Sequence, residues 1–155
     1  MRRLGVFIAT CGYIGYAPVA PGTFGSAAGL LVFYAVRSTH SNAVELAAIV
    51  LLFVVGVWSG TEAEHHFGGI DPGPIVLDEV VGMLITLAFI PVNGVGALVG
   101  FLLFRVLDIV KPWPSARFEH LPGGLGVMAD DAMAAIYGNV IMLILVRFAP
   151  VGWLV

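Results

Sequence analysis

Carboxylate side chains gather from residue 71 onward in a chain that is otherwise largely apolar. They are Asp71, Asp78, Glu79, Asp108, Glu119, Asp130 and Asp131. Ionisable groups beside apolar helices are costly, so they usually mark functional sites. Carboxylates that converge repel one another unless a cation neutralises them. Because Mg²⁺ prefers oxygen ligands, the pattern predicts a magnesium site, with Mn²⁺ as the alternative.

Two adjacent acidic pairs, Asp78-Glu79 and Asp130-Asp131, stand near the expected starts of apolar helices. Taken singly, each pair is explained by acids that complement a helix dipole, an effect of about 0.3–1 kcal/mol. Convergence of both pairs with Asp108 favours metal binding instead. Neighbours on a helix point about 100° apart. We therefore expect each pair to give one metal ligand and one outer or substrate-facing group, without knowing which is which.

The segment RVLDIVK places Arg105, Asp108 and Lys111 three residues apart, along one stripe of a helix end. One interpretation is a surface ion-pair ladder in which Lys111 finishes the helix. The functional interpretation is that Arg105 and Lys111 bind a phosphate beside the metal ligand Asp108. Arginine binds phosphate through two parallel hydrogen bonds, and lysine binds it as a point charge.

Two glycine-rich stretches, APGTFGS (20–26) and PGGLG (122–126), precede expected helix starts. Helix N-termini bind anions, so Thr23 and Gly124 are candidate contacts for a substrate phosphate. Thr23 or Ser26 is also expected to cap its helix. Ordinary turn chemistry explains each stretch equally well, and neither is a Walker loop, because no Gly-Lys-Ser/Thr follows.

Composition excludes several classes of protein. Charged residues make up 11% of the chain, against about 25% in an average soluble domain. The net charge of −3 offers no basic surface for nucleic acid. The one cysteine excludes an internal disulfide and a cysteine-based zinc site. Adjacent His65 and His66 cannot easily face one ion, so we expect them in a loop or at the membrane interface.

Five apolar helices are expected, over residues 23–36, 43–58, 75–90, 94–110 and 130–148. Several are shorter than the roughly 20 residues that span a bilayer. The predicted fold is therefore an all-α, compact, multi-pass membrane bundle of about five helices, some of them short or partly interfacial. The length suits a single domain over 1–155.

Alternating the direction of these helices gives a topology with the N-terminus inside. Most basic residues then lie inside, as the positive-inside tendency requires. The inner set is Arg2, Arg3, Arg105, Lys111 and Arg117, and the outer set is Arg37 and Arg147. The same threading places the metal candidates together on the inner face. They are Asp71, Asp78, Glu79, Asp108, Asp130 and Asp131.

Four ordered blocks resemble the phosphatidylglycerophosphatase A family. They are APGTFGS (20–26), DPGPIVLDEVVG (71–82), FRVLDIVKPWP (104–114) and GGLGVMADD (123–131). The resemblance implies a Mg²⁺-dependent phosphatase of the bacterial inner membrane that removes the phosphomonoester of phosphatidylglycerophosphate to give phosphatidylglycerol. Its implied partners are this lipid and the bilayer. The catalytic set that follows is Asp78, Glu79, Asp108, Lys111, Asp130 and Asp131. Residues 40–67 match no block, so Glu45, Glu62 and Glu64 gain no role from it.

Other mechanisms and other classes lack their signatures. No Cys-x5-Arg motif follows Cys11, because Ala17 occupies the arginine position, and no DxDxT motif is present. Water activated by a carboxylate base is therefore the expected nucleophile, with a covalent aspartyl intermediate as the alternative. A small transporter or ion-binding membrane protein would use the same acids along a conduction path, and an interaction subunit would use them structurally. A transporter predicts charges near mid-helix, whereas these lie at helix ends.

The threading predicts that residues 59–77 and 111–129 are cytoplasmic and that the C-terminus is periplasmic. Gly68→Cys and His120→Cys variants are expected to resist a membrane-impermeant thiol reagent in intact cells. Ready labelling of either position from outside would contradict this topology.

Overall fold

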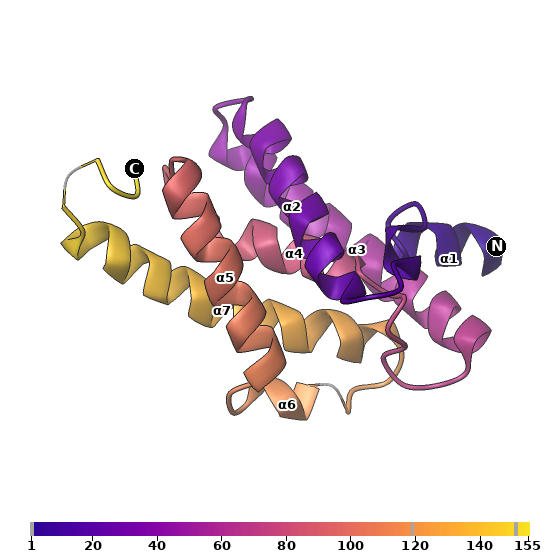
Figure 1. Cartoon of the computed structure of the whole chain (residues 1–155). Helices are drawn as coiled ribbons and strands as arrows, with labels where there is room; N and C mark the ends of the chain where they lie inside the picture. The colour runs from indigo at the N-terminus through magenta and orange to yellow at the C-terminus, as the bar shows by residue number, and fades with distance from the viewer. Residues whose placement is uncertain (1, 119, 151) are drawn as a thin grey trace.

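The computed structural model describes residues 2–118, 120–150 and 152–155, which leaves Glu119 outside the described residues. The elements follow in the order α1 (Arg2–Ala9), η1 (Ile14–Tyr16), α2 (Pro21–Arg37), α3 (Asn42–Phe67), α4 (Leu77–Thr86), α5 (Gly94–Val110), α6 (Ser115–Phe118) and α7 (Gly124–Phe148). Figure 1 shows α5 crossing α7, with α1 beside the C-terminal part of α3. The described part of the chain contains helices and no strands, so the predicted all-α class is confirmed.

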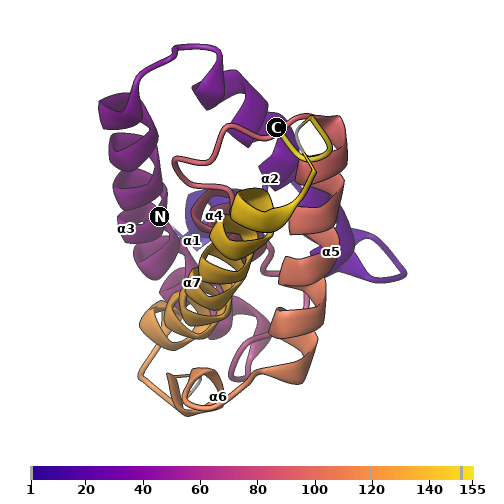
Figure 2. The ribbon, with the colours of Figure 1, turned by 90° about the vertical axis from the view of Figure 1, so that its left-hand side faces the viewer.

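Helix α4 is the buried centre of the bundle. It packs against α2, α3, α5 and α7, and Figure 2 shows it enclosed by them. Its Met83 and Leu84 are fully buried in a core shared with Phe33 of α2, Phe104 of α5 and Met142 of α7. Ten residues correspond to about 15 Å of helix, half of a hydrocarbon core of about 30 Å. Helix α4 is therefore too short to cross a membrane by itself.

Close backbone contact holds α2 against α4. A methyl group added at Gly29 would lie 2.8 Å from Cβ of Met83 and 3.0 Å from Cα of Val80. No larger residue fits there without moving a helix. The glycines of the segment that begins with APGTFGS thus serve packing as well as the turn.

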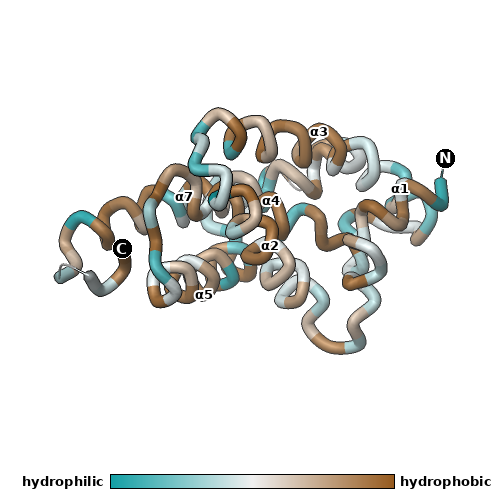
Figure 3. The backbone as a smooth tube through the Cα atoms, turned by 90° about the horizontal axis from the view of Figure 1, so that it is seen from above, coloured by the Kyte–Doolittle hydropathy of each residue, from teal (hydrophilic) through white to brown (hydrophobic). Residues whose placement is uncertain are grey.

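Helices α3 and α7 are long and apolar enough to cross a membrane, with 26 and 25 residues. Figure 3 shows hydrophobic residues along much of α3. Large apolar side chains point away from the protein, including Leu51 and Val54 on α3 and Ile144 on α7. Soluble monomers rarely expose contiguous apolar surface of this kind. The two helices therefore indicate membrane association.

Several predicted helix bounds are wrong for identifiable reasons. Helix α3 continues to Phe67, because its stop signal is Gly68 in the left-handed region with φ of 74°. His65 and His66 are consequently helical rather than in a loop. Helix α4 ends at Thr86, where the chain makes successive turns instead of continuing to Ile90. The bounds of α5 match the prediction.

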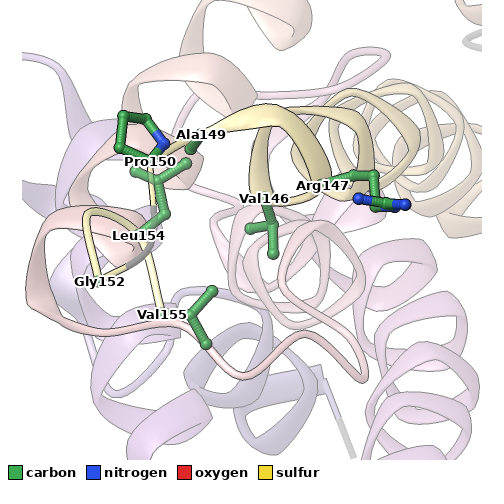
Figure 4. A pocket seen from close by; sticks show the side chains of 7 residues that line it. All are labelled: Val146, Arg147, Ala149, Pro150, Gly152, Leu154 and Val155. Carbon is green, nitrogen blue, oxygen red and sulfur yellow. The ribbon is translucent and has the colours of Figure 1, made fainter.

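The chain end folds back onto the start of α5. The Asn93 side-chain amide donates to the carbonyl oxygens of Gly152 and Trp153, at 3.3 and 3.2 Å. A hollow of about 240 Å³ lies between this tail and the end of α7 (Figure 4). Val146 lines the hollow and lies about 22 Å from Asp131 along the axis of α7. The hollow is therefore separate from the carboxylates.

Candidate active site

Three carboxylates from two helices converge at the N-terminal end of α4. Asp78 and Glu79 lie in its first turn, as predicted, and Asp131 faces them from α7. One oxygen of each lies within 4.8 Å of the other two. Asp78 and Asp131 are only 6% and 4% exposed. Bulk water therefore cannot screen their mutual repulsion.

The same three side chains present oxygens that suit a cation. Among the described residues, Asp78 Oδ1, Glu79 Oε2 and Asp131 Oδ2 are buried and accept no hydrogen bond. Buried polar atoms nearly always have partners, so such atoms point to a missing ion or water. A hard divalent cation prefers anionic oxygen ligands of this kind. The residues therefore fit Mg²⁺.

Electrostatics in the first turn of α4 lead to the same conclusion. Burial raises the pKa of Asp78 above its ordinary value, and the carboxylates of Asp71 and Asp130 raise it further. Burial also raises the pKa of Glu79, followed in effect by the charge of Asp78, while Arg105 opposes the rise. The anionic forms are thus unfavourable until positive charge enters the cluster.

Arg105 joins α5 to this cluster. Its Nη1 lies 2.8 Å from Oδ2 of Asp108 and 3.6 Å from Oε1 of Glu79. Gly22 of α2 lies directly against the pair, because a methyl group there would be 2.1 Å from Glu79 Oε1 and 2.9 Å from Arg105 Nη1. Gly22, the first glycine of APGTFGS, is therefore required at the site, because a side chain there would collide with Glu79 and Arg105.

The predicted caps of α2 are wrong. The helix begins at Pro21 after Ala20, which has left-handed geometry and makes no side-chain cap. Ser26 instead donates from Oγ to the Gly22 carbonyl at 2.9 Å. Thr23 is partly buried and follows Gly22 in the first turn. Proline at the first position has no N–H to satisfy, and the Thr23 amide donates to the Ala20 carbonyl at 2.9 Å.

Lys111 leaves the stripe that its spacing predicts. Helix α5 ends at Val110, and Lys111 turns into the left-handed region with φ of 45°. Its Nζ lies 2.5 Å from Asp130 Oδ2 and 3.9 Å from Asp71 Oδ2. Lys111 therefore bridges α7 and the loop before α4, and all six predicted metal carboxylates belong to one connected polar cluster.

The acids of α7 are not in its first turn. Helix α7 begins at Gly124, so Asp130 and Asp131 lie nearly two turns inside it and the dipole interpretation does not apply to them. Gly124 itself packs against α3, and its amide donates to Thr61 Oγ1 at 2.9 Å. It lies about 9 Å before Asp130 along the helix. The structure therefore does not bring Gly124 into the cluster.

Two further side chains shape the site and were missed in the sequence. Glu64 Oε1 accepts a hydrogen bond from the amide of Asp71 at 3.1 Å, which holds a residue in left-handed geometry with φ of 46°. Buried Ser115 donates from Oγ to the Asp130 carbonyl at 2.7 Å. Neither bond has a short sequence spacing that would reveal it.

Fold and site together define a helical, membrane-associated protein with a buried acidic centre edged by arginine and lysine. The family model described as Phosphatidylglycerophosphatase A matches residues 7–146. The chain belongs to the phosphatidylglycerophosphatase A family, a family of phosphatases.

Individual relatives agree with this assignment. The Phosphatidylglycerophosphatase A of Escherichia coli K12 is 35% identical over 89% of this chain and 81% of its own. That of Haemophilus influenzae is 39% identical over 79% and 77%. A Bacteroides thetaiotaomicron protein named "Putative phosphatidylinositol-3-phosphatase" is 35% identical over 91% and 92%. No solved structure matches the chain.

If Lys111 neutralises phosphoryl charge in the transition state, Lys111→Ala is expected to lower kcat by roughly 10². Lys111→Arg should restore only part of kcat, since a planar fork does not replace a compact ammonium. The measurement is kcat on detergent-solubilised substrate together with the thermal stability of the same preparation. Arg117→Ala is the control, because Arg117 stacks on Trp113 at 5.6 Å instead. Normal kcat with a stability loss would make Lys111 a structural residue.

Proposed function

We propose that this chain is a Mg²⁺-dependent lipid phosphatase that hydrolyses phosphatidylglycerophosphate to phosphatidylglycerol and phosphate. The reaction takes place at the cytoplasmic face of the bacterial inner membrane. The observation that carries the proposal is the convergence of three buried carboxylates within 4.8 Å, with Arg105 and Lys111 at their edge.

Asp78, Glu79 and Asp131 would hold the cation. When bound, Mg²⁺ supplies positive charge that stabilises developing charge on phosphoryl oxygens and favours a water nucleophile at neutral pH. Asp108 and Asp130 have a different task, because each pairs with a basic side chain. They orient Arg105 and Lys111 toward the space that the substrate phosphate enters.

Arg105 and Lys111 would bind the phosphate from two sides. Arg105 offers planar donors that match two phosphoryl oxygens, and Lys111 adds a compact charge. A carboxylate of the cluster accepts the proton of the attacking water as general base.

The substrate class follows from the relatives and from the apolar helices. The names of the relatives specify two different lipids, phosphatidylglycerophosphate and phosphatidylinositol 3-phosphate. Both carry a phosphate monoester on a glycerophospholipid headgroup. Such a lipid keeps its acyl chains in the bilayer and its phosphate at the interface. Helices α3 and α7 supply membrane-length apolar surface, and the family model supports the phosphatidylglycerophosphate substrate.

Phosphate release from phosphatidylglycerophosphate is expected with Mg²⁺ and not with EDTA. It should exceed release from phosphatidylinositol 3-phosphate under the same conditions. Asp78→Asn should lower activity by about two to three orders of magnitude, because a charge that holds the cation is lost. Glu62→Gln on α3 is the matched carboxylate-to-amide control and should keep normal activity. Full activity and unchanged Mg²⁺ dependence in Asp78→Asn would overturn the metal assignment. Preference for the inositol lipid would overturn the substrate assignment.

A further inference from the structure

At the end opposite the carboxylates, α4 stops at Thr86 and the chain continues in turns. Thr86 is fully buried, and Ala88 is 8% exposed. Phe89 then takes a left-handed conformation with φ of 61°, and its side chain is partly exposed. Backbone groups freed in apolar surroundings are costly unless other groups satisfy them.

Asn139 of α7 satisfies two of the freed carbonyl groups. Its Nδ2 donates to the Thr86 oxygen at 3.2 Å and to the Ala88 oxygen at 3.1 Å. The preceding Gly138 permits this approach, because a methyl group there would lie 3.1 Å from Thr86 Cγ2. Helices α4 and α7 thus meet through a specific polar contact as well as through apolar packing.

Glu45 of α3 pairs with the Phe89 amide in the same turn. It is 2% exposed, and its Oε1 accepts a hydrogen bond from the Phe89 amide at 3.1 Å. Its Oε2 accepts one from Arg37 Nη1 of α2 at 3.2 Å. Arg37 neutralises the buried charge, so three helices hold the end of α4.

The register of α4 and α7 connects this contact to the active site. Asp78 faces Asp131 at one end, and Thr86 bonds to Asn139 at the other. Both steps cover eight residues, or about 12 Å of helix. The two helices therefore run in parallel with matched register. A slide or rotation of α4 at its C-terminal end would displace Asp78 and Glu79 relative to Asp131 by a similar amount.

We propose that Asn139 and Glu45 are positioning residues that form a latch on α4 and set the geometry of the carboxylate cluster. The latch comprises Asn139, Glu45 and the backbone of residues 86–89. Neither side chain touches the substrate. Their effect passes along α4, whose main-chain hydrogen bonds make it stiff. This inference rests on the proposed function, because the geometry that the latch sets is that of the cation site.

The test measures Mn²⁺ binding to the purified full-length protein in detergent, without substrate. Electron paramagnetic resonance detects the bound Mn²⁺. Asn139→Leu keeps the branched shape and the number of side-chain heavy atoms and removes both hydrogen bonds to α4. We expect Mn²⁺ affinity to fall about tenfold, the scale seen when supports of metal ligands are lost. If the leucine variant does not fold, Asn139→Ser replaces it, because the shorter serine side chain cannot reach both carbonyls. Its Mn²⁺ affinity is compared with that of the wild type in the same way.

Asn93→Leu is the matched control. It removes an amide whose bonds go to the C-terminal tail and to the Gly96 amide, not to α4. We expect it to lower the melting temperature while Mn²⁺ affinity stays close to that of the wild type. Wild-type affinity in the folded Asn139 variants, or an equal loss in Asn93→Leu, would overturn the latch. No Mn²⁺ binding by the wild-type protein would overturn the proposed metal site itself, and the latch with it.

Discussion

Electrostatic repulsion among Asp78, Glu79 and Asp131 is the constraint on which the rest of the structure depends. Their oxygens lie within 4.8 Å of one another, so at an effective dielectric constant of about 20 each pair of ionised groups repels by at least about 3 kcal/mol. Burial adds a desolvation cost of several kcal/mol for each ion. Folding alone would separate such groups. The cation of the proposed function would offset this repulsion, and one buried oxygen of each of the three side chains accepts no hydrogen bond.

The surrounding helices hold the short helix α4 in place. Helix α4 carries two of the three acids, and it is held by backbone contact with α2 at Gly29 and by the bonds of Asn139 at its far end. The basic side chains are positioned from a different helix. Arg105 and Lys111 come from the end of α5. In the proposed function, the groups that would bind phosphate and the groups that would hold the cation are therefore placed by different helices.

Local chemistry in the sequence predicted those features that depend on near neighbours. The first-turn position of Asp78 and Glu79 and the bounds of α5 follow from short spacings. The ion pair of Arg105 with Asp108 also has a short spacing, and it is the contact that the alternative interpretation, an ion-pair ladder, predicts. The start of α7 does not follow from short spacings, because it depends on the packing of Gly124 on α3. The roles of Glu64, Ser115 and Asn139 were equally hidden, since their partners lie far along the chain or on backbone atoms that carry no sequence signal.

Anomalous diffraction from crystals grown with Mn²⁺ tests the central claim most directly. Data collected at the manganese absorption edge would locate the cation without reference to activity. The account predicts one strong peak at coordination distance from oxygens of Asp78, Glu79 and Asp131, with Arg105 and Lys111 outside its ligand set. A peak confined to Asp108 or Asp71, or no peak within the cluster at saturating Mn²⁺, would contradict it.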